Sequence, residues 1–141
     1  MTPTPDDPAA ALNEVLSEVI DLVQDVKQAH RKVPESHALH AELDQLFDDL
    51  RGWAGMLFEQ DEALGISPLA SMTSVAGRTP PNLWPGSPTD EEVCTLIDDH
   101  LGRLAEHLAT AMAAQDEGPT RAAMAEVKRG VSVHRATLAR L

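Results

Sequence analysis

The side chains best suited to chemistry in this 141-residue chain gather on one stretch, from Ser36 to Gly65. Read at 3.6 residues per turn, His40, Asp44 and Glu59 fall within an arc of roughly 100° on one side of a helix. The same arc carries three further potential ligands: His37, Asp48 and Glu62. Imidazole nitrogens and carboxylate oxygens suit iron, zinc or manganese. The arc is therefore a candidate metal site, and the alternative interpretation is an ordinary solvent-exposed charged face.

The length of this helix decides how such a site could form. His40 and Glu59 lie about 28 Å apart along the axis at 1.5 Å per residue, so one chain cannot bring both to one ion. Two copies packed antiparallel about a twofold axis would place Glu59 of one copy beside His40 and Asp44 of the other. Such an isologous dimer would contain two equivalent sites.

An apolar stripe on the other side of this helix indicates that it packs in a bundle. Ser36 is the expected N-cap, and Gly65 is the expected C-terminal glycine. The stripe consists of Leu39, Leu43, Leu46, Leu50, Trp53, Leu57 and Leu64.

Similar stripes predict three more long helices, namely Pro8–His30, Thr89 or Asp90 to Gln115, and Pro119 or Thr120 to Leu141. In the last of these helices, Leu141 is expected to point inward, and His134 is expected to be a hydrogen-bonded core residue. His30, at the end of the first stripe, is either a structural residue, a helix cap or a metal ligand.

The connection from about Ile66 to Pro88 is long enough to cross from one end of a bundle to the other, and Leu69–Val75 could form a short helix within it. The sequence therefore predicts an all-α, ferritin-like four-helix bundle at residues 9–141, with a long crossover connection between the second and third long helices. Residues 1–8 are expected to be a disordered tail.

Composition narrows the choice of partners. The formal net charge of −12, from 23 acidic and 11 basic residues, disfavours DNA binding and favours cations. The single cysteine, Cys94, is expected to be a small apolar residue in a reducing compartment. No apolar run is long enough to span a membrane, and the first residues lack the features of a signal peptide. We therefore expect a cytoplasmic protein.

Several motifs occur in an order that resembles the Dps family, the ferritin-like proteins of starved bacterial cells. Ala29–His30 is followed by Leu39–His40, then by Asp44, by Glu59 and by Ala63–Gly65. PLASMTSVAG and NLWPG resemble the family's connecting segment, and DEGPTRAAMAEVKRGVSVHRATLARL resembles its last helix. The resemblance covers about residues 22–141.

The resemblance implies a four-helix subunit that forms twofold dimers within a dodecameric hollow shell. Such proteins bind ferrous iron between two subunits, oxidise it, commonly with peroxide, and store the ferric mineral, which protects the cell during oxidative stress. Carried over to this chain, the catalytic ligands are His30, His40 and Asp44 of one subunit and Glu59 of the other. The implied enzyme is a ferroxidase, a metal-ion oxidoreductase, provided that this inter-subunit site is intact.

Two differences from the pattern of the Dps family bear on whether this inter-subunit site is intact. Gly55 stands where the family has a second carboxylate, four residues before the glutamate, and the link between His30 and His40 is slightly shorter than in the family. We expect weaker iron binding, unless His37, Asp48 or Glu62 substitutes for the missing carboxylate. The alternative is a Dps-like shell or a dimeric helical module without a working ferroxidase centre, with a structural or DNA-shielding role.

Overall fold

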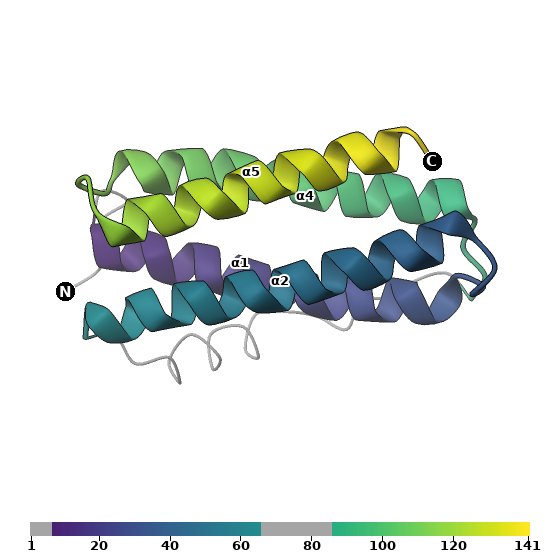
Figure 1. The fold of residues 1–141 in the computed structure, drawn as a ribbon, viewed down its shortest axis with the longest axis horizontal. Coiled ribbons are helices and arrows are strands. Elements are labelled where there is room, and N and C mark those ends of the chain that lie inside the picture. Colours follow the sequence, from purple (N-terminus) through teal and green to yellow (C-terminus); the bar gives the residue numbers. More distant parts are fainter. Residues whose placement is uncertain (1–6, 66–85) are drawn as a thin grey trace.

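The computed structural model describes residues 7–65 and 86–141, which form a bundle of four long helices (Figure 1). The helices are α1 (Pro8–Lys32), α2 (Ala38–Ala63), α4 (Asp90–Ala113) and α5 (Pro119–Ala139). The described residues contain no strand. The predicted all-α, ferritin-like architecture is confirmed.

Each helix packs against two neighbours: α1 lies against α2 and α4, and α5 lies against the same two. Neighbouring helices run in opposite directions (Figure 1), and α2 and α4 both begin at the same end of the bundle. At that end His37, just before α2, contacts Asp90, the first residue of α4. The last residue of α2 and the first residue of α4 therefore lie at opposite ends of the bundle. The short helix predicted at Leu69–Val75 lies outside the described residues, as do residues 1–6 of the predicted tail.

The predicted apolar stripes form one continuous core. Its largest fully buried side chains are Leu12, Leu16, Leu22, Leu43, Leu46, Leu50, Leu57, Ile97, Leu101, Leu104, Leu108 and Met124. Leu64 and Leu141 were expected to face inward, but they are 46% and 53% exposed. Both predictions are wrong because each leucine lies beyond the last residue of its helix, where the helical periodicity no longer sets its direction.

Local signals at the helix ends explain where the elements begin and stop. Thr89 and Glu92 form a capping box at α4, with reciprocal bonds of 3.1 and 3.2 Å. The N-cap of α2 is His37 and not Ser36, because a turn closed by the His37 amide and the Pro34 carbonyl delays the helix. Gly65 follows α2 with a φ of 77°, as expected of a C-terminal glycine.

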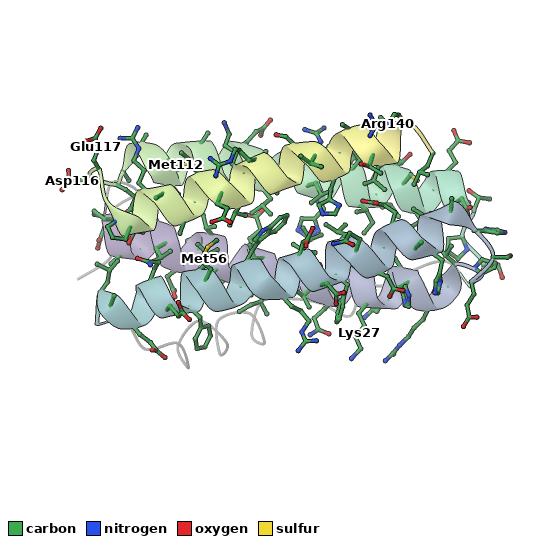
Figure 2. All side chains as sticks on the ribbon, in the orientation of Figure 1. Lys27, Met56, Met112, Asp116, Glu117 and Arg140 are labelled. Atoms are coloured by element: carbon green, nitrogen blue, oxygen red, sulfur yellow. The ribbon has the colours of Figure 1, made fainter. Side chains whose placement is uncertain are left out.

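Side chains fill the space between the four helices, while charged groups cover their outer surfaces (Figure 2). Asp116 and Glu117 lie in the connection between α4 and α5 at one end of the bundle, and Arg140 lies at the opposite end. Among the described residues, no helix combines the length and the apolar character needed to cross a membrane.

Candidate metal centre

Three potential metal ligands meet where the end of α1 passes the beginning of α2. His30 comes from the last turn of α1, while His40 and Asp44 lie one turn apart on α2. One ligand atom from each residue lies within 4.8 Å of the other two. In the part of the chain that the structure describes, this is the one group of three or more such side chains with that geometry.

The orientation of His40 is set by the backbone between the two helices. Its Nδ1 lies 2.9 Å from the carbonyl oxygen of Val33. Because a carbonyl only accepts hydrogen bonds, Nδ1 must carry the proton, and Nε2 of the neutral ring keeps its lone pair for a cation. Val33 is thus a supporting residue that the side-chain pattern could not reveal, because it acts through its backbone.

His30 has a buried nitrogen whose surroundings fit a metal ion. Its Nε2 lies 2.8 Å from Oδ1 of Asp44, yet this atom is buried and has no partner with hydrogen-bond geometry. The rings of His30 and His40 are adjacent, with centroids 3.9 Å apart. A nitrogen and an oxygen that approach without forming a hydrogen bond are arranged as two ligands of one ion would be. The shorter link does not keep His30 away from the cluster.

The cluster is open on one side. The side chain of His30 is 29% exposed, whereas that of Asp44 is 64% exposed and faces outward. Two imidazoles and one carboxylate can hold a divalent metal on one face and leave its remaining positions free for other ligands. The open side is where a further ligand would have to enter.

The other predicted ligands do not join this cluster within the chain. Glu59, Asp48 and Glu62 are exposed on α2. Glu59 is about 28 Å from His40 along the helix axis, as the rise of 1.5 Å per residue requires. The fourth candidate, His37, contacts a carboxylate oxygen of Asp90 at 2.9 Å.

Two other features of the chain do not resemble catalytic sites. Burial, helped by the carboxylates of Asp90 and Asp98, raises the pKa of the Cys94 thiol, which makes it a poor nucleophile.

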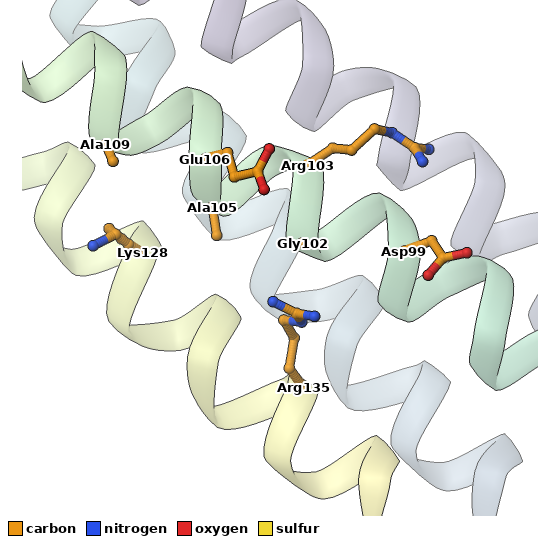
Figure 3. Close-up of a pocket in the computed structure, with 8 residues that line it drawn as sticks. All are labelled: Asp99, Gly102, Arg103, Ala105, Glu106, Ala109, Lys128 and Arg135. Atoms are coloured by element: carbon orange, nitrogen blue, oxygen red, sulfur yellow. The ribbon is translucent and has the colours of Figure 1, made fainter.

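A hollow of about 530 Å³ lies between α4 and α5 (Figure 3). Its Arg135 donates to Asp98 at 2.8 Å, and this hydrogen bond raises the pKa of the guanidinium. The hollow is lined by side chains of both charges and by small residues, including Gly102.

Comparisons with known proteins find similarity among solved structures. No family model and no curated protein sequence matches the chain. Among solved structures, the chain is similar to Dps from Microbacterium arborescens, determined in its high iron form. The identity is 26% and the TM-score is 0.78, and the match covers 94% of this chain and 92% of the other. Nearly the full length of both chains therefore shares one fold.

Proposed function

We propose that this chain, a Dps-like protein with the ferritin fold, binds ferrous iron at a centre shared by two copies, oxidises it and stores the ferric product. The observation that carries the proposal is the convergence of His30, His40 and Asp44 on one point between α1 and α2. The similarity to a Dps structure in a high iron form supports iron as the metal.

Glu59 of a second copy is the proposed fourth ligand. Two α2 helices packed antiparallel would bring Glu59 of one copy to the open side of the cluster on the other. The outward position of Asp44 and the exposure of Glu59 leave both side chains accessible for this contact. The shell assembled from such dimers is part of the proposal.

The chain's own groups bind and orient the iron, while an oxidant such as hydrogen peroxide accepts the electrons. Two ferrous ions lose one electron each, and one molecule of hydrogen peroxide takes up these two electrons and two protons and becomes two molecules of water. His30 and His40 contribute neutral nitrogens, and Asp44 and Glu59 contribute negative oxygens that favour the higher charge of ferric iron. The net charge of −12 attracts cations to the protein.

Gly55 reduces the number of carboxylates near this centre. The space around it is open, so no other side chain of the described residues occupies its place. With two imidazoles and two carboxylates, the centre has the ligands for one ion held firmly, and we propose weaker binding of any second ion. Zinc and manganese suit the same ligand set and are expected competitors.

Ferrous oxidation by single variants tests the proposal. His40→Ala and Glu59→Ala should each slow the peroxide-dependent rise in ferric absorbance by about tenfold or more, because each removes a ligand. Glu117→Ala is the matched control, since it removes an exposed carboxylate in the connection between α4 and α5. An unchanged rate in Glu59→Ala would count against the shared centre, and an unchanged rate in His40→Ala would count against the centre altogether.

A further inference from the structure

His134 is buried in the bundle and connects α5 to two carboxylates of α2, one largely enclosed and one at the surface. It is 5% exposed and lies on the core stripe of α5, between Val131 and Leu138. Its Nδ1 lies 2.6 Å from Oε1 of Glu42, and its Nε2 lies 2.7 Å from Oδ2 of Asp49. The two carboxylates are seven residues apart on α2, so a single ring bridges about 10.5 Å of that helix.

Both contacts are within hydrogen-bond distance, so each nitrogen of the His134 ring is bonded to a different carboxyl group of α2. A ring held at both nitrogens cannot turn without breaking one of the two hydrogen bonds. The bridge therefore consists of two hydrogen bonds that join one side chain of α5 to two side chains of α2.

The surroundings of His134 restrict its movement. The indole ring of Trp53 meets it edge-on, with centroids 6.0 Å apart. Glu42 is also largely enclosed, with its side chain 13% exposed, whereas the side chain of Asp49 is 38% exposed. Losing either His134 or Glu42 would leave the other as a buried polar group without this partner, which is costly.

The same part of α2 carries the proposed metal ligands. Glu42 lies between His40 and Asp44 in the sequence, and it points toward α5 while they point toward α1. Because an α-helix is stiff over two turns, fixing Glu42 and Asp49 against α5 also fixes the rotation of α2 about its axis.

We propose that His134 is a positioning residue for the metal centre, because its bridge to Glu42 and Asp49 holds α2 in the rotation that directs His40 and Asp44 toward His30. The role as a bridge rests on the contacts of His134 alone, and the consequence for metal binding rests on the proposed function.

The bridge can be measured in the unmodified protein without any metal. Solid-state NMR of protein labelled with ¹⁵N and ¹³C, with the His134 signals assigned by their loss in His134→Gln, should show each ring nitrogen in close contact with a side-chain carboxyl carbon. A ring nitrogen without such a neighbour would overturn the bridge.

The positioning role is tested by the affinity and visible spectrum of bound Co²⁺, a spectroscopic substitute for ferrous iron. His134→Gln should bind Co²⁺ about tenfold more weakly, as is typical when a group that orients a ligand is lost, and the absorption bands should shift as the ligand geometry relaxes. Val131→Ala is the control, because it weakens the same core stripe one turn away without touching either carboxylate. Its affinity and spectrum should match those of the unmodified chain.

Glu42→Ala removes one end of the bridge from the α2 side, and it should weaken Co²⁺ binding by a similar factor even if His134→Gln does not fold. Unchanged affinity in Glu42→Ala, or an equal loss in Val131→Ala, would overturn the positioning role. His40→Ala in the same titration separates the two proposals: if it binds Co²⁺ as tightly as the unmodified chain, the metal centre itself is wrong, whatever the bridge does.

Discussion

Gly130 is the position at which a single methyl group should most disturb the packing of α2 against α5. A Cβ atom built there would lie 2.1 Å from Cζ2 of Trp53, and 2.9 and 3.1 Å from two other indole atoms. Since carbon atoms pack at about 3.5–4.0 Å, Gly130→Ala requires the indole ring or α5 to move by about 1.5 Å. The ring cannot move freely, because its other neighbours include His134.

The expected loss of stability follows from two opposing effects. Alanine in a helix interior is favoured over glycine by about 1 kcal/mol. Overpacking of a core usually costs about 1–3 kcal/mol, and a displacement of this size belongs in the upper part of that range. We therefore expect Gly130→Ala to lower the free energy of unfolding by about 1–2 kcal/mol.

Gly52→Ala on α2 is the matched control. Apart from the adjoining residues and the backbone of its own helix, no described atom lies within 4 Å of a Cβ built at Gly52, so this change should raise stability by about 0.5–1 kcal/mol. Urea unfolding followed by circular dichroism, at one protein concentration because assembly contributes to stability, would measure both variants. If Gly130→Ala were as stable as Gly52→Ala, the described packing of Trp53 against α5 would be wrong.

Three further predictions concern a helix cap, a thiol and the metal centre. Thr89→Ala breaks the capping box of α4 and should cost about 1 kcal/mol, seen as a lower melting temperature than that of the exposed control Thr95→Ala. The raised pKa of Cys94 predicts slower alkylation by iodoacetamide at pH 8 than a free cysteine shows. Because the folded form holds this proton more tightly, the thiol's contribution to stability is present below its ordinary pKa of 9.0 and is lost as the pH rises through the raised value. Gly55→Asp adds a carboxylate in open space and should strengthen Co²⁺ binding, and equal affinities in calorimetry would contradict this.

Helical periodicity was sufficient to predict the bundle. The stripes placed the core leucines correctly, such as Leu43 on α2 and Leu104 on α4, because burial repeats every 3.6 residues wherever a helix continues. The pattern failed where a helix stops, at Leu64 and Leu141. It also failed at Ser36, because the preceding turn and not the residue type determines where α2 begins.

The candidate site could be predicted only in part. His30, His40 and Asp44 were named from spacing and resemblance, and the structure brings them together. The contact of the Val33 carbonyl with His40 could not be predicted from the sequence, because every residue has a backbone carbonyl. The position of His134 on a core stripe predicted that its ring is hydrogen-bonded, and this is confirmed. The hydrogen-bond partners of His134 could not be predicted, because they depend on how α5 lies against α2.

The shared centre is tested most directly by mixing two defective chains. One chain carries His40→Ala and Asp44→Asn, and the other carries Glu59→Ala. Each chain alone should bind Co²⁺ poorly. In a heterodimer with twofold symmetry, one centre combines an intact His40–Asp44 pair with an intact Glu59, while the other centre loses both halves.

The decisive measurement is therefore a Co²⁺ titration of heterodimers purified through a different affinity tag on each chain. We predict one tight site per heterodimer, with the visible spectrum of the unmodified protein. If mixing restores no tight site, or if Glu59→Ala alone binds as tightly as the unmodified chain, the centre is not shared between copies and the account is contradicted.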